Sequence, residues 1–138
     1  PLVSNPVKIG GREYLDGGIA APIPIYKAED DGYEKNLIIL TRENDYRKDP
    51  VRAGFLLNFF LKDYPHLVDQ LKNRYEVYNQ TIDYIRKKEK KGDFFVFRPK
   101  NLDIDRFSKD KEKLKEIYNS AYKIAENCSE ELLDWLKS

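Results

Sequence analysis

The sequence predicts an α/β fold in which the first third of the chain supplies part of a sheet and the remainder is mainly helical. Three observations lead to this prediction. Residues 7–14 have the pattern of a β-hairpin, residues 36–41 form a nearly continuous apolar run of strand length, and residues 65–91 repeat apolar side chains at helical spacing. We therefore expect part of an α/β core over residues 1–48. A mainly helical extension should follow over residues 49–138, with one short strand at about 94–98.

Length and composition fit one modest globular domain or part of one with an appendage. The 138 residues are 41% hydrophobic and 36% charged, and 25 basic residues nearly balance 24 acidic ones. This balance argues against nucleic-acid binding, for which a basic stripe is expected. The single cysteine, Cys128, cannot form an internal disulfide. No apolar run is long enough to span a bilayer and no signal-peptide pattern is visible, so we expect a cytoplasmic setting. No metal-ligand spacing or phosphate-binding loop is visible, so we expect no metal or cofactor, and the sequence does not indicate an oligomeric state.

The hairpin has a defined register. Its strands cover residues 7–9 and 12–14, and the Gly10-Gly11 pair between them tolerates the positive φ angles of a two-residue turn. With that turn, Lys8 lies opposite Glu13 as a cross-strand charge pair. The outgoing strand therefore delivers the next residues to a defined strand end.

One carboxylate lies just beyond that strand end. Asp16 is followed at once by Gly17 and Gly18. Because glycine has no Cβ, a neighbouring loop or a substrate can approach this carboxylate closely, which suits a general base. Asp-Gly is also common turn chemistry, so the same residues fit a plain turn.

A short helix and the apolar strand follow. Residues 24–31 should form one or two helical turns that close near Gly32. The strand over residues 36–41 is apolar on both faces, so it should be buried on both sides and needs neighbours that this sequence does not supply. The polar loop after it either contacts a phosphate or carboxylate of a substrate or forms exposed salt bridges, and the candidate residues are Arg42, Tyr46, Arg47 and Lys48.

The extension begins with two helices. Asp49 and Pro50 match an N-cap and a first helical residue, so a helix should start there. Its apolar run over residues 55–61 should be buried on more than one side, or alternatively should form a lipid-contacting wall. A long amphipathic helix over residues 65–91 should close at Gly92. The cations at 86–91 either attract anionic lipid or complement the helix dipole.

The last third predicts a strand and two helices. The aromatic run at 94–97 should add to an edge of the main sheet and end before Pro99. A helix over residues 110–127 should bury its apolar face, with Cys128 as a packing residue at its end. Ser129 should then cap a final helix whose Leu and Trp side chains pack inward.

These elements resemble the catalytic-aspartate region of the patatin-like phospholipase family, and in particular its bacterial predicted-esterase branch, which carries a helical C-terminal extension. The family pattern Gly-Arg-x-Tyr-x-Asp-Gly-Gly matches residues 11–18 and is followed by Pro-Ile-Pro-Ile at 22–25 and a strand ending at 40–42. The branch pattern matches Tyr64-Pro65, Arg-x-x-x-Tyr-Asn at 74–79, the strand ending Arg98-Pro99, and Leu-x-x-x-Tyr at 114–118.

The resemblance implies the C-terminal part of a patatin-like three-layer α/β/α domain and a serine acyl hydrolase acting on lipid or carboxylic esters. Asp16 would be the base of a Ser-Asp dyad, with Gly17, Gly18 and Arg42 near the substrate. None of the five serines lies in a Gly-x-Ser-x-Gly turn, so we expect the nucleophile and oxyanion hole upstream, in a missing N-terminal part of the same protein. The alternative is a non-catalytic helical interaction or lipid-docking module with peripheral membrane contact.

Overall fold

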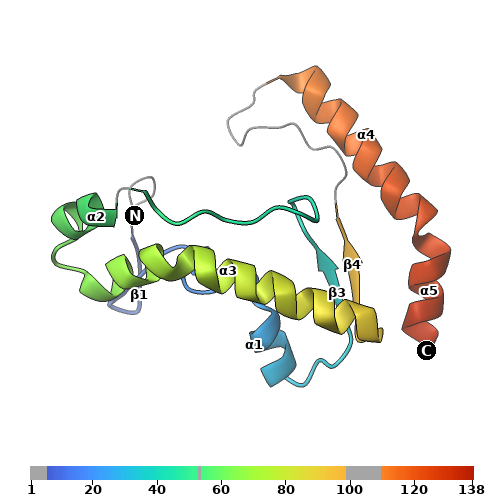
Figure 1. The fold of residues 1–138 in the computed structure, drawn as a ribbon, viewed down its shortest axis with the longest axis horizontal. Coiled ribbons are helices and arrows are strands. Elements are labelled where there is room, and N and C mark those ends of the chain that lie inside the picture. The colour runs from blue at the N-terminus through green and yellow to red at the C-terminus, as the bar shows by residue number, and fades with distance from the viewer. Residues whose placement is uncertain (1–5, 53, 99–109) are drawn as a thin grey trace. The chain divides into compact units, whose positions relative to one another are not determined.

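The computed structural model describes residues 6–52, 54–98 and 110–138 (Figure 1). Helices and short strands are mixed in it, as the predicted α/β class requires. In chain order the elements are β1 Val7–Ile9, β2 Arg12–Tyr14, the 3-10 helix η1 Gly17–Ile19, α1 Ile25–Asp30, β3 Asn36–Ile39, α2 Gly54–Phe60, α3 Pro65–Lys91, β4 Phe94–Phe97, α4 Lys111–Asn127 and α5 Ser129–Lys137.

The chain divides into two compact units. The first consists of Pro1–Asp30 and Arg47–Tyr84, and the second of Asp31–Tyr46 and Ile85–Ser138. Helix α3 therefore contributes its N-terminal part to the first unit and its C-terminal end to the second. Its bounds and its closure at Gly92, which has φ +84°, are those predicted from the sequence.

The hairpin of the first unit has the predicted register. Strands β1 and β2 pair antiparallel with Lys8 opposite Glu13, and both turn glycines have positive φ. The Lys8 Nζ atom lies 3.4 Å from Glu13 Oε1. All six strand residues are exposed, so cross-strand pairing and the turn define this hairpin.

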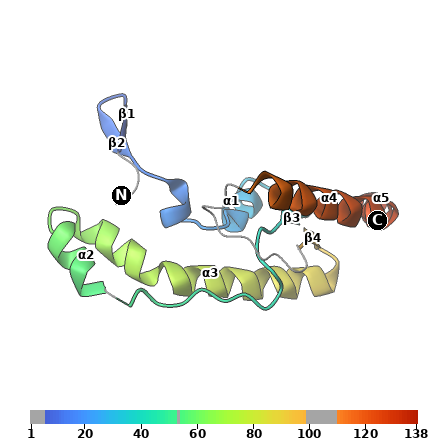
Figure 2. The ribbon, with the colours of Figure 1, turned by 90° about the horizontal axis from the view of Figure 1, so that it is seen from above.

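An extended segment replaces the helix start predicted at Asp49-Pro50. Residues 47–51 run alongside helix α3 in both views (Figures 1 and 2), and α2 begins only at Gly54. This segment is bound by Asn79 of α3, whose side chain accepts from the Lys48 N–H at 2.9 Å and donates to the Lys48 carbonyl at 3.1 Å. These bonds hold the backbone just before Asp49 in an extended conformation.

Helix α2 is mostly uncovered within the described residues. Its Leu57 is 8% exposed, whereas Phe55 is 72%, Phe59 76% and Phe60 64% exposed. The prediction that this helix is buried on more than one side is therefore wrong, because Leu57 is the only α2 side chain among the described residues that is buried. Among the described residues of the first unit, the other buried side chains are Ile25, Val68, Thr81 and Ile82.

Strands β3 and β4 form a parallel pair in the second unit, in register from Asn36 with Phe94 to Ile39 with Phe97. This pairing confirms that the aromatic strand adds to the sheet of the apolar strand. It corrects the expectation that the sequence supplies no neighbour for β3. It also corrects the expected burial on both faces, because Ile38 is 8% exposed whereas Leu37 is 47% and Ile39 73% exposed.

Helices α4 and α5 begin and end close to the predicted positions, but the cap of α5 and the packing of both helices differ from the prediction. Asp110 caps α4 by accepting from the Glu112 and Lys113 N–H groups at 3.0 and 3.2 Å. Ser129 does not cap α5, because its hydroxyl donates back to the Glu126 carbonyl at 2.7 Å. The predicted inner faces are largely exposed, as shown by Leu114, Tyr118, Leu133 and Leu136.

Trp135 links α5 to the end of α3 in the second unit. Its Nε1–H donates to the Gly92 carbonyl at 2.6 Å, and its ring packs on Phe95 with centroids 5.7 Å apart.

Across the described residues, no helix combines the length and apolarity needed to cross a bilayer.

Candidate active site

Asp16 lies at the surface directly after strand β2 and caps the short helix η1. Its Oδ1 atom accepts a hydrogen bond from the Gly18 N–H at 2.8 Å, and its backbone carbonyl accepts from the Ile19 N–H at 3.1 Å. The residues thus form the Asp-Gly turn that the sequence allowed. Among the described residues, no hydrogen bond to Asp16 Oδ2 is found, so this oxygen can accept a hydrogen bond from another group.

Arg74 of helix α3 also contacts this turn. Its Nε–H donates to the Gly18 carbonyl at 2.7 Å in a partly buried bond. Gly18 therefore uses its N–H toward Asp16 and its carbonyl toward Arg74. Arg74 was not among the predicted site residues, although the Arg-x-x-x-Tyr-Asn pattern at 74–79 contained it. Arg74 and Gly18 are 56 residues apart in the chain, so no local sequence pattern could predict that they contact each other.

Gly17 and Gly18 differ in their surroundings. A Cβ atom at Gly18 would lie 3.2 Å from Asp16 Oδ1 and 3.5 Å from Arg74 Nη2. A Cβ atom at Gly17 would meet nothing within 4 Å. The carboxylate and the edge of the guanidinium thus lie on the same side of Gly18, and of the two glycines it is Gly18 where an added Cβ would be crowded.

A second contact attaches the segment after Asp16 to helix α3. The Tyr84 hydroxyl lies 2.8 and 2.7 Å from the two carboxylate oxygens of Glu29 on α1. The ring of Tyr84 also packs on Tyr26, with centroids 5.0 Å apart. Arg74 and Tyr84 therefore fix the chain between Asp16 and the end of α1 to one face of α3.

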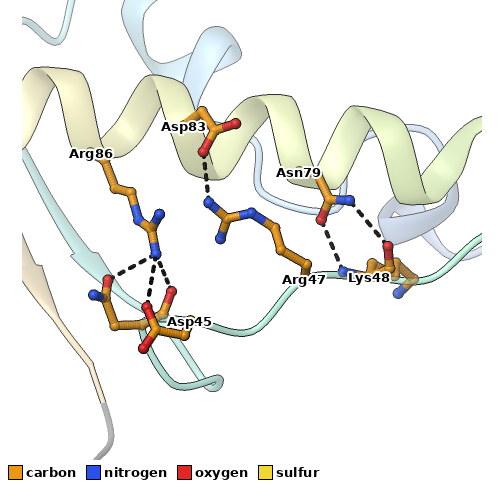
Figure 3. Close-up of polar contacts among 7 residues, drawn as sticks. Asp45, Arg47, Lys48, Asn79, Asp83 and Arg86 are labelled. Carbon is orange, nitrogen blue, oxygen red and sulfur yellow. Dashed lines mark hydrogen bonds and ion pairs between the residues drawn. The ribbon is translucent and has the colours of Figure 1, made fainter.

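The polar loop residues lie in both units. In the first unit, Arg47 forms a salt bridge with Asp83 at 2.7 Å (Figure 3), as the salt-bridge alternative predicted. The Lys48 ammonium lies over the Tyr78 ring, 5.6 Å from its centroid. In the second unit, Arg42 lies over the ring of Tyr46 at 5.0 Å.

Arg86 makes the remaining contacts drawn in Figure 3, within the second unit. Its Nη2 donates to the backbone carbonyl of Asn44 and lies 3.7 Å from Asp45 Oδ1. One member of the basic cluster at 86–91 thus holds a turn of its own unit.

No described serine hydrogen-bonds to Asp16. The Ser129 hydroxyl donates to the Glu126 carbonyl of the preceding helix α4, and the Ser138 hydroxyl donates to the Trp135 carbonyl of α5. Ser4 and Ser108 lie outside the described residues. Among the residues that the structure describes, no group of three or more His, Cys, Asp and Glu side chains could hold a metal ion.

Comparison with known proteins identifies one family. A family model described as "Domain of unknown function (DUF6363)" matches residues 64–137, which is more than half of the chain and runs from the start of α3 to the end of α5. The match includes Arg74 and Tyr84, the α3 residues that hold the Asp16 segment. Neither a curated protein nor a solved structure matches the chain.

Proposed function

Because the chain belongs to the DUF6363 family, whose description states no function, we propose an activity from the chemistry around Asp16: the chain is the part of a serine acyl hydrolase that supplies the general base. One observation carries this proposal. The Asp16 carboxylate lies exposed in a glycine-flanked turn, and Gly18 binds one of its oxygens while no residue in the described part of the chain hydrogen-bonds to the other.

The reaction requires a serine hydroxyl next to Oδ2 of Asp16. As the serine oxygen attacks the acyl carbon of an ester, its proton passes to Asp16, and backbone N–H groups stabilise the negative charge on the carbonyl oxygen. The proton then passes to the departing alcohol. We assign the serine and the oxyanion hole to a segment outside these residues, in keeping with the resemblance to patatin-like phospholipases. The proposed setting is cytoplasmic.

The exposed face of β3 supports this larger arrangement. Leu37 and Ile39 are 47% and 73% exposed, although an apolar strand of this kind normally lies inside a sheet covered on both faces. We place the β3–β4 pair at the margin of a patatin-like three-layer α/β/α core. Further strands and helices of the intact protein would then cover these side chains.

The decisive experiment measures p-nitrophenyl ester hydrolysis by the full-length protein that contains this chain. Asp16→Asn removes the base while keeping the side-chain shape, so kcat should fall about 10²- to 10⁴-fold. Glu13→Gln is the matched control, because Glu13 is an exposed carboxylate of the same hairpin that pairs with Lys8. Unchanged hydrolysis in Asp16→Asn refutes the proposed function.

A second candidate function is lipid docking through helix α2. It is favoured by the exposed aromatic side chains of Phe55, Phe59 and Phe60, which resemble the apolar face of an interfacial helix. Co-sedimentation of the chain with phosphatidylcholine vesicles, with and without phosphatidylglycerol, tests it. Phe55→Ser with Phe59→Ser should abolish binding, whereas Tyr118→Ser of α4, which removes an aromatic side chain that is 66% exposed, should not. Absence of binding to both vesicles contradicts this candidate.

A further inference from the structure

We propose that Arg74 is a positioning residue for the Asp16 carboxylate and acts through the Gly18 peptide; this inference rests on the proposed function and deepens it. Two consecutive hydrogen bonds carry it. Arg74 Nε donates to the Gly18 carbonyl at 2.7 Å, and the Gly18 N–H donates to Asp16 Oδ1 at 2.8 Å. Because Gly18 takes part in both bonds, loss of the bond from Arg74 should shift Gly18 and thereby weaken its bond to Asp16.

The two ends of this connection differ in rigidity. Asp16 follows a hairpin whose six strand residues are exposed, and it precedes two glycines, which lose the most conformational freedom on ordering. Arg74 belongs to a helix of 27 residues whose Val68 and Ile82 are buried in the first unit. The helix therefore supplies the fixed point, and the turn takes its position from the helix.

The guanidinium suits this role chemically. A hydrogen bond from a charged donor is about twice as strong as one between neutral groups, and the planar fork of arginine fixes its direction. The position of a Cβ at Gly18, close to both Asp16 Oδ1 and Arg74 Nη2, shows that the two charged groups approach one side of the same residue. The arginine thus places a positive charge on the side where the carboxylate lies.

The first test observes the hydrogen bond itself by NMR, without any need for catalysis. In the 138-residue chain, the Gly18 amide proton should shift upfield in Arg74→Gln, in the same direction as in Asp16→Asn, because both weaken the Gly18 N–H bond. Arg74→Lys keeps one charged donor and should give an intermediate shift. An unmoved Gly18 amide in Arg74→Gln, with the fold intact by circular dichroism, overturns the proposal.

Lys72→Gln is the matched control. Lys72 is a cation on the same helix, two residues away, and its ammonium donates to Asn58 Oδ1 at 2.9 Å, whereas the side-chain atoms nearest to a Cβ at Gly18 belong to Asp16 and Arg74. It should leave the Gly18 amide unmoved. A shift as large as that of Arg74→Gln would mean that Gly18 reports general loosening of the unit, and it would overturn the proposal.

The second test is kinetic and uses the full-length protein. A displaced base lowers kcat without changing substrate binding, so Arg74→Gln should reduce kcat about 10- to 100-fold with KM changed less than twofold. Arg74→Lys should recover part of the loss, and Lys72→Gln should match the parent. Reduced stability with unchanged kcat would make Arg74 a structural anchor only and overturn the proposal. If Asp16→Asn retains full activity, the proposed function fails. The NMR experiment then still shows whether Arg74 positions the Asp16 carboxylate through Gly18.

Discussion

The side-chain amide of Asn79 binds both backbone groups of Lys48, accepting from its N–H at 2.9 Å and donating to its carbonyl at 3.1 Å (Figure 3). The Asn79 amide thus offers Lys48 one acceptor and one donor, as the backbone of a neighbouring β-strand would. Asn79 thus attaches the segment before α2 to helix α3. The adjacent Arg47–Asp83 salt bridge, at 2.7 Å, reinforces the attachment.

Removing this amide should destabilise the first unit. Asn79→Ala leaves two partly buried backbone groups of Lys48 without their partner, and we expect a loss of about 1 to 2 kcal/mol in the free energy of unfolding. Asn79→Asp keeps an acceptor for the N–H and should lose less. Urea unfolding monitored by circular dichroism measures both, and equal stability of all three proteins would contradict the importance of these bonds.

The two faces of α2 should respond differently to truncation. Leu57→Ala empties a core position that is 8% exposed, so unfolding free energy should fall by about 2 to 3 kcal/mol. Phe59→Ala removes a larger side chain that is 76% exposed and should change stability by less than about 0.5 kcal/mol. Thermal unfolding compares them. A larger loss in Phe59→Ala would show that a second surface covers this helix in solution.

Gly92 should resist substitution because of its backbone conformation. Its φ of +84° follows the end of α3 and disfavours residues with a Cβ, so Gly92→Ala should cost about 1 kcal/mol. Gly92→Asn should cost less, because asparagine tolerates this region better. Gly54→Ala is the control, since Gly54 begins α2 without a positive φ and alanine favours helix. A Gly92→Ala protein as stable as the parent contradicts the assigned cap.

The Arg98–Glu89 pair should contribute more than an exposed ion pair. Two hydrogen bonds of 2.6 Å join the guanidinium and the carboxylate, whose side chains are 16% and 33% exposed. Arg98→Lys cannot form both bonds, and we expect a loss of about 1 to 2 kcal/mol. A double-mutant cycle with Glu89→Gln isolates the coupling. The exposed Lys8–Glu13 pair is the comparison and should give under about 1 kcal/mol.

Local patterns in the sequence were sufficient to predict the register, bounds or cap of several elements. The register of the β1–β2 hairpin follows from its two-glycine turn, the bounds of α3 follow from Pro65 and Gly92, and Asp110 caps α4 as its residue type favours. Each of these outcomes depends on residues within a few positions of one another. The turn at Asp16 and its two glycines was predictable for the same reason, because it forms within one short motif.

Tertiary structure decided the features that depend on partners far away in the sequence. The N-cap preference of Asp49 is worth about 1 kcal/mol, and the contacts of Asn79 and Arg47 with α3 hold that segment extended instead. The parallel pairing of β3 with β4 and the bond from Arg74 to Gly18 likewise join segments that no local pattern relates. Apolar composition alone could not show which faces of α2 and β3 are covered, because coverage depends on which surfaces the folded chain brings against them.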